Sequence, residues 1–200
     1  MRKLKLQVQI SIDGFIADTN GSSDWLVWNW APVWNWDDEL KKYFNDLMDS
    51  VDCVLLSRKM AEEGFIEHWT KLSQNPNDPQ FTFASSIANA SKVVFTKTLK
   101  QSRWDNTTLA KGDLIGEVNS LKNQSRSGGK DIIVYGGASF VSALIKAGLI
   151  DEFYLFVNPT VLGSGMPIFK ELSHKLKLTL VKSKSYDCGV AVLKYVLKKD

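Results

Sequence analysis

The sequence predicts an α/β fold built on a mostly parallel sheet with an antiparallel carboxyl-terminal edge. Strand-like and helix-like segments alternate along the whole 200-residue chain, a pattern typical of parallel strands joined by helical crossovers. The clearest crossover lies in residues 132–157, where a strand, a glycine pair, an apolar helix and a second strand follow one another. The last two strand-like segments, 175–182 and 190–197, have no helix between them and predict the antiparallel edge.

Length and composition indicate one globular domain, residues 1–200. With 44% hydrophobic and 24% charged residues, the chain is neither disordered nor fibrous. A net charge of +3 lacks the basic excess of nucleic-acid-binding proteins, so we expect no nucleic-acid partner. Two cysteines and two histidines give no metal-ligand spacing, so we expect no metal. No apolar run is long enough for a membrane span, which predicts a cytoplasmic protein with no membrane partner.

The elements of the amino-terminal half follow from hydrophobic spacing. Residues 4–12 alternate apolar and polar side chains and predict a strand over 3–12. The segment 13–36 is irregular and holds five of the seven tryptophans. Acidic residues 37–39 then begin a helix with apolar residues at helical spacing. After it we expect a buried strand over 51–56, a helix over 57–69, a loop over 70–80, a short helix over 81–90 and a strand over 92–96.

The carboxyl-terminal half continues the alternation. We expect a loop with a weak strand over 97–111, an amphipathic helix over 112–124, a flexible segment over 125–129, a strand over 132–135, a helix over 138–147 closed by Gly148, and a strand over 152–157. Leu176, Leu178 and Leu180 would share one face of the strand over 175–182. The closing strand, 190–197, is apolar at both parities, which predicts that both of its faces are covered. The protein's own helices would cover one face, and a second subunit is a candidate for the other.

Glycines, hydroxyls and cations follow three of the expected strands. Gly136, Gly137, Ala138 and Ser139 lie between a strand and a helix, where a backbone can approach a phosphate closely, although the same glycines could simply form a tight turn. The other two positions are Ser57–Arg58–Lys59–Met60 and Thr96–Lys97. Each alone is typical of a solvated surface. Because carboxyl ends of parallel strands form the ligand site of open α/β sheets, the three together favour a phosphorylated cofactor.

The tryptophan-rich loop offers a further candidate. Its tryptophans are Trp25, Trp28, Trp30, Trp34 and Trp36. They could form a lid, a subunit contact, or an aromatic wall for a flat heterocycle. The acids Asp13, Asp24, Asp37 and Asp38 border this loop, and one of them could donate a proton or hold a ring nitrogen, although acids at such positions are commonly caps and turn formers.

Several segments taken in order resemble the dihydrofolate reductase superfamily, most closely the branch with the reductase domain of the bacterial riboflavin-pathway deaminase-reductase. These segments are 11–17, 57–60, 94–99, 135–139, 148–152 and 159–169, and together the resemblance spans residues 4–197. It implies a three-layer fold whose mostly parallel sheet has eight strands and flanking helices. Ser57 and Met60 depart from the glycine and threonine usual in the family, and no zinc deaminase signature occurs.

The resemblance also implies NADPH as the cofactor. Residues 136–139 would then contact the pyrophosphate. The adenosine ribose and its 2′-phosphate would be contacted by Arg58, Lys59, Thr96 and Lys97, and the nicotinamide would be bordered by Ile16 and Ala17. Trp25 would stand near the site of hydride transfer, and Asp13 and Asp38 are candidate substrate-binding acids.

These expectations define three hypotheses. The first is an NADPH-dependent reductase of a small heterocyclic substrate, most like 5-amino-6-(5-phosphoribosylamino)uracil reductase. The second is a dihydrofolate or pterin reductase, and the third a non-catalytic NADPH-binding protein. Relatives in the riboflavin branch are commonly dimers, which together with the apolar loop predicts a homodimer.

Overall fold

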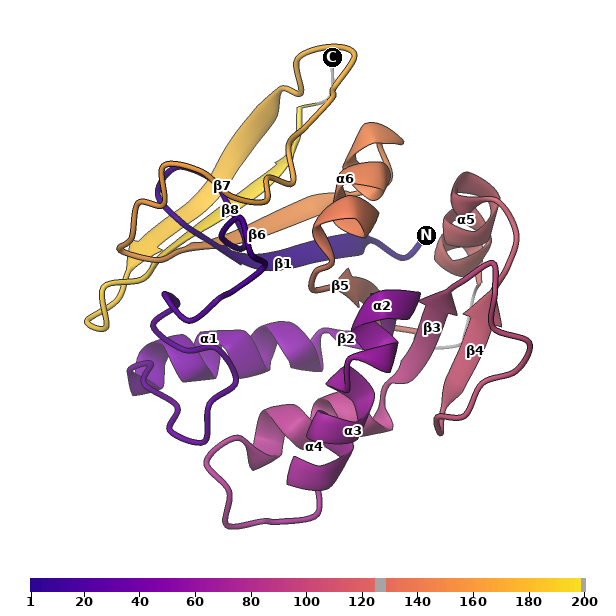
Figure 1. Cartoon of the computed structure of the whole chain (residues 1–200), viewed down its shortest axis with the longest axis horizontal. Coiled ribbons are helices and arrows are strands. Elements are labelled where there is room, and N and C mark those ends of the chain that lie inside the picture. Colours follow the sequence, from indigo (N-terminus) through magenta and orange to yellow (C-terminus); the bar gives the residue numbers. More distant parts are fainter. Residues whose placement is uncertain (125–128, 199–200) are drawn as a thin grey trace. The chain divides into compact units, whose positions relative to one another are not determined.

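The computed structural model describes residues 1–124 and 129–198 (Figure 1). Most of the flexible segment expected at 125–129 therefore lies outside the described residues. The strands are β1 (Leu4–Ile10), β2 (Val51–Ser57), β3 (Ser91–Phe95), β4 (Thr107–Ala110), β5 (Asp131–Val134), β6 (Glu152–Val157), β7 (Leu178–Ser185) and β8 (Ala191–Leu197). The helices are α1 (Asp38–Asp49), α2 (Arg58–Glu62), α3 (Phe65–Leu72), α4 (Phe81–Asn89), α5 (Leu114–Asn123) and α6 (Ala138–Lys146).

The sheet has eight strands in the order β4-β3-β2-β5-β1-β6-β8-β7. The pairs β1–β6, β2–β3, β2–β5 and β3–β4 are parallel, whereas β6–β8 and β7–β8 are antiparallel. The α/β fold with a mostly parallel sheet, an antiparallel carboxyl-terminal edge and flanking helices is therefore confirmed. Among the described helices, none combines the length and the apolar character that a membrane crossing requires.

The chain divides into two compact units. The first unit comprises Met1–Leu4 and Lys42–Gly137, and the second comprises Lys5–Lys41 and Ala138–Asp200. Strand β1 and helix α1 each begin in one unit and continue in the other.

An aromatic group fills the core of the first unit beside β2, β3 and β5, most of whose residues are buried. Trp69 of α3 meets Phe83 of α4 edge to face at 4.6 Å, and these two helices lie side by side (Figure 1). Phe83 also stacks on Phe44 of α1 at 4.5 Å. The hydroxyl of Tyr135, directly after β5, contacts the sulfur of Met48, and burial raises the pKa of this phenol. These contacts fix the helices against the sheet.

Two expected elements differ in the structure. The single helix predicted over 57–69 is two helices, α2 and α3, because Gly64 between them adopts a left-handed conformation with φ 97°. Strand β7 begins at Leu178, so Leu176 does not share a strand face with Leu178 and Leu180. Leu180 is 49% exposed, and most of β7 lies at the surface of the described chain. The weak strand expected within 97–111 is present as β4.

Candidate functional site

Three strands of the first unit end at the same edge. Strands β3 and β5 both pair parallel with β2, in registers that set Leu55 opposite Val93 and Val134. The residues at and just after these strand ends, from Ser57, Thr96 and Tyr135 onward, hold the eight predicted cofactor residues of the first unit. We call this edge the carboxyl edge of the first unit. The structure thus brings the sequence-predicted positions 57–60, 96–97 and 136–137 to one edge, as expected for a ligand site on a parallel sheet.

The first of these segments forms the start of α2. The Ser57 hydroxyl accepts a hydrogen bond from the Met60 N–H at 3.2 Å, which makes Ser57 the N-cap. Arg58 is exposed, and its guanidinium donates to the Glu62 carboxylate one turn later at 2.5 Å. Lys59 forms the equivalent, looser pair with Glu63 at 3.6 Å. Both cations remain solvent-exposed, and each is paired with a carboxylate one turn later.

The second segment is a turn held by Thr96. Its hydroxyl oxygen accepts from the backbone N–H groups of Thr98 and Leu99, both at 3.1 Å. Lys97 projects from this turn, and its ammonium donates to the carbonyl oxygens of Lys111 and Gly112 at 2.7 and 2.6 Å. An ammonium has three N–H donors. Lys97 is thus anchored in position while one donor remains for a ligand.

The third segment is the glycine pair after β5. Gly137 has φ 81°, a backbone conformation that residues with side chains rarely adopt. Gly136 is buried and has no positive φ, yet a Cβ added there would contact no atom within 4 Å. The backbone at Gly136 is therefore open to close approach by a group such as a phosphate, so the residues present fit a dinucleotide pyrophosphate. Ala138 and the exposed Ser139 begin α6, in the second unit.

The second unit has its own candidate site, where the parallel strands β1 and β6 end. Asp13 follows β1, and its carboxylate accepts from the Ser11 hydroxyl at 2.6 Å and from the Leu162 and Gly163 N–H groups at 3.2 and 2.7 Å. The Ser11 bond, with those two N–H groups, holds the pKa of Asp13 below its ordinary value. Asp13 therefore joins the loops after β1 and β6 as a carboxylate.

Ile16 and Ala17 are held by the loop after β6. The Ile16 N–H donates to the Met166 carbonyl at 3.0 Å, and the Met166 N–H donates to the Ala17 carbonyl at 2.8 Å. A Cβ at Gly165 would lie 2.3 Å from the Ala17 oxygen, so only glycine fits there. This pairing positions the two residues predicted to border the nicotinamide.

Three of the five loop tryptophans form an interior cluster in the second unit. Trp28 stacks on Trp34 at 4.9 Å and meets Trp36 edge to face at 4.9 Å, and Trp36 stacks on Phe156 of β6 at 5.5 Å. Trp25 is half-buried, with its indole N–H donating to the Ser22 carbonyl at 3.3 Å. Trp25 and the 38% exposed Trp30 are thus the loop tryptophans available for contact with a substrate or a partner.

One buried amide that sequence reasoning missed holds this loop in place. Asn158, directly after β6, is fully buried, and its side-chain oxygen accepts from the Val27 N–H at 2.9 Å. Its amide nitrogen donates to the Phe156 carbonyl at 3.2 Å. The only sequence signal is a polar residue between a strand and Pro159.

The acids at the start of α1 have different surroundings. Asp37 accepts from the Leu40 N–H at 2.9 Å and the Cys188 N–H at 3.3 Å. Burial opposes ionisation of Asp37, but these bonds outweigh it and lower its pKa. Asp38 is fully exposed and pairs with Lys41 at 3.1 Å. In residues 1–124 and 129–198, no group of three or more His, Cys, Asp or Glu side chains is placed to hold a metal ion.

Comparison with known proteins decides the family. The model of the RibD C-terminal domain matches residues 2–192. This chain belongs to the RibD C-terminal domain family. Two uncharacterized proteins of Bacillus subtilis (strain 168), YyaP and YwjB, are each 31% identical to this member of the family. The match to YyaP covers 97% of this chain and 94% of YyaP, and the match to YwjB covers 94% of this chain and 95% of YwjB.

Solved structures share the fold of this family member. A putative riboflavin biosynthesis protein from Shewanella sp. PV-4 superposes with a TM-score of 0.68 at 24% identity, over 100% of both chains. The diaminohydroxyphosphoribosylaminopyrimidine deaminase/5-amino-6-(5-phosphoribosylamino)uracil reductase of Thermotoga maritima gives 0.65 at 18% identity, over 98% of this chain and 57% of that one. These likenesses confirm the dihydrofolate-reductase-like fold expected from the sequence.

Proposed function

We propose that the protein is an NADPH-dependent reductase of a small heterocyclic substrate, most like 5-amino-6-(5-phosphoribosylamino)uracil reductase. The observation that carries this proposal is the carboxyl edge of the first unit. There, the open backbone at Gly136 lies at the same edge of the parallel strands as Arg58 and the anchored Lys97. Membership of the RibD C-terminal domain family supports the same reaction class.

In this proposal the first unit binds the adenosine end of the cofactor. Six residues of this unit surround the ribose and its 2′-phosphate: Ser57, Arg58, Lys59, Met60, Thr96 and Lys97. The cations form charge-assisted hydrogen bonds, which are about twice as strong as neutral ones. Gly136 and Gly137 let the backbone approach the pyrophosphate. Ala138 and Ser139, which begin α6 in the second unit, are the remaining residues predicted to contact it.

The second unit then holds the reacting partners. The nicotinamide, when bound, supplies the hydride; the protein orients it and excludes water. Ile16 and Ala17 border the ring, in positions fixed by their backbone bonds to Met166. Asp13 and Trp25 contact the substrate. Asp38 is the weaker candidate for that role, because its carboxylate is fully exposed and paired with Lys41.

The decisive experiment measures NADPH oxidation with the full-length chain. The substrates are 5-amino-6-(5-phosphoribosylamino)uracil, its dephosphorylated riboside, dihydrofolate and other pterins. Turnover of the aminouracil ribosides supports the proposal. Turnover of dihydrofolate or pterins alone points to the folate-type reductase, and tight NADPH binding without any oxidation points to the non-catalytic binding protein.

We also propose that the protein acts as a cytoplasmic homodimer. Strand β7 is one of the two end strands of the sheet and pairs on one side with β8. Leu180 and Val181 on it are 49% and 54% exposed. An exposed edge strand with apolar side chains is a template for pairing with a second chain. Pairing across β7 would cover these side chains.

A further inference from the structure

A pocket of about 320 Å³ lies in the first unit at the opposite end of its strands from the carboxyl edge. It is bounded by the end of α1, the start of β2, the last turns of α4 and the residue before β5. Ser85 and Ser86 of α4 line it with short side chains, which leaves the hollow open. At roughly 30 Å³ per water molecule this volume holds on the order of ten waters. The pocket therefore has the size of a small metabolite.

The lining holds charges of both signs that do not neutralise each other. Asp49, the last residue of α1, and Lys130 both face the pocket, and among the described residues neither forms an ion pair. Carbonyl groups at the end of a helix add negative potential beside Asp49. Polar groups of Ser85, Ser86 and Asn89 complete the lining.

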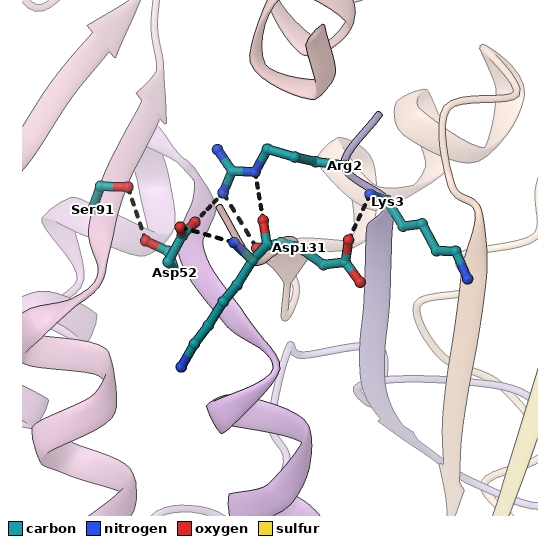
Figure 2. Close-up of polar contacts among 6 residues, drawn as sticks. Arg2, Lys3, Asp52, Ser91 and Asp131 are labelled. Atoms are coloured by element: carbon teal, nitrogen blue, oxygen red, sulfur yellow. Dashed lines mark hydrogen bonds and ion pairs between the residues drawn. The ribbon is translucent and has the colours of Figure 1, made fainter. Parts of the chain in front are cut away.

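A second acid at the pocket is held rigidly. The Asp52 carboxylate pairs with the guanidinium of Arg2, which is 8% exposed, and accepts from the Lys130 N–H at 3.2 Å. Arg2 also donates to the Lys130 carbonyl at 2.6 Å. The Ser91 hydroxyl donates to the Asp52 carbonyl at 3.0 Å, and Figure 2 shows Arg2, Asp52 and Ser91 in this group. Because Asp52 is already neutralised by Arg2, Asp49 is left as the acid available to a ligand. The same bonds fix the backbone at Lys130.

We propose that this pocket binds a small zwitterion, a free amino acid. Its ammonium pairs with Asp49, and its carboxylate pairs with Lys130. Its polar side chain bonds to Ser85, Ser86 and Asn89. Asp49 and Lys130, two exposed side chains of opposite sign, line the same pocket, so a zwitterion can pair with both at once. The site is independent of the proposed reductase function, because its residues lie at the other end of the strands.

The test is isothermal titration calorimetry on the full chain with L-serine, L-asparagine and L-glutamine. Ethanolamine, which lacks the carboxylate, and lactate, which lacks the ammonium, are the matched partial ligands. We expect at least one amino acid to bind, and Asp49→Asn and Lys130→Gln each to weaken it about tenfold or more. Asp46→Asn is the control, because Asp46 lies on α1 outside the pocket lining and pairs with Lys42.

A variant that fills the pocket, Ser85→Phe, should also abolish binding while it remains folded by circular dichroism. The proposal is overturned if none of the three amino acids binds at millimolar concentration. It is equally overturned if ethanolamine or lactate binds as tightly, or if Asp49→Asn and Lys130→Gln bind like the original chain. NADPH binding should be unchanged in both charge variants, so failure of this site and failure of the reductase proposal are distinguishable.

Discussion

Gly136 and Gly137 are adjacent residues with opposite tolerance for a side chain. A Cβ on Gly136 has open space around it, so Gly136→Ala should unfold at the same temperature as the original chain. In the proposed site that Cβ occupies the space of the pyrophosphate, and NADPH affinity should fall about tenfold or more. Gly137→Ala should instead lose about 1–2 kcal/mol of stability because of its φ of 81°. Thermal melts and fluorescence titration check both, and unchanged NADPH affinity in Gly136→Ala would contradict the pyrophosphate assignment.

Arg58 offers a test of cofactor choice. Its exposed pair with Glu62 contributes only about 0.3–0.5 kcal/mol to stability, so either residue can be replaced without unfolding the chain. Arg58→Ala should lower the preference for NADPH over NADH about tenfold or more, because a charge-assisted bond to the 2′-phosphate is lost. Glu62→Gln, the matched control, releases the guanidinium and should keep that preference. Equal ratios of the two affinities in the original chain and Arg58→Ala would reject this role.

For individual residues, the sequence identified which of them follow the strands but not the hydrogen-bond partners of their side chains. Ser57, Thr96 and Gly136 could be placed because strand ends follow from hydrophobic spacing. Asp13 accepts from the Leu162 and Gly163 N–H groups, and Asn158 accepts from the Val27 N–H. In both cases the bonded residues lie far apart along the chain. Local spacing carries no information about such pairs.

The buried side chain of Lys92 caps the carboxyl end of helix α4. Its side chain is 2% exposed, and its ammonium donates to the carbonyls of Ile87, Ala88 and Ala90 at the end of α4. Burial, only partly offset by Asp105, lowers the pKa of Lys92 to about 8. Between that value and the ordinary 10.5, the unfolded chain binds more protons than the folded chain. Stability from this group therefore rises with pH over that window.

Between pH 8 and 9.5 the free energy of unfolding is expected to rise by up to about 2 kcal/mol, at 1.36 kcal/mol per pKa unit. Urea unfolding at several pH values measures it. Lys92→Met removes the titrating group, so its stability should lack this rise. If both proteins showed the same pH dependence, the buried ammonium would not be its source.

The tryptophan cluster makes the loop 22–36 a packed element despite its lack of regular structure. Trp28 is 1% exposed between two other rings, so Trp28→Ala should cost about 3–5 kcal/mol. Trp30→Ala, at a 38% exposed position of the same loop, should cost less than about 1 kcal/mol. Chemical denaturation of the two variants provides the comparison. Equal losses would mean that the cluster does not stabilise the second unit.

Hydrophobic periodicity predicted most of the helices and strands. It did not predict the break between α2 and α3 at Gly64, for a simple reason. Ala61, Phe65 and Trp69 keep helical spacing across the break and are all buried. A helix divided into α2 and α3 therefore carries the same hydrophobic pattern as one continuous helix. Glu63 and the left-handed Gly64 separate them, and a glycine inside a helical pattern is compatible with both outcomes.

For the whole molecule, the proposed homodimer predicts about twice the 22.5 kDa chain mass by light scattering. Val181→Lys places a charge on the exposed edge strand β7 and should return the mass to that of one chain. Val161→Lys, at a 65% exposed site outside β7, should leave the mass doubled. A single-chain mass for the original protein at micromolar concentration would contradict the dimer.

The fold class was predictable from the sequence because alternating elements and two closing strands restrict the possible topologies. The division into two units was not, because both are assembled from separate stretches of chain. Hydrophobic spacing describes neighbours along the chain and cannot show that residues 1–4 belong with 42–137.

That division has a consequence for synthesis on the ribosome. The first unit has all of its residues once the chain has been made through Gly137. The second unit does not, since Lys5–Lys41 must wait for the final stretch from Ala138. During that interval Trp36 has no Phe156 to pack on, and apolar side chains exposed in this way are binding sites for chaperones. The nascent chain should therefore be most prone to aggregation after Gly137 and before β6 emerges.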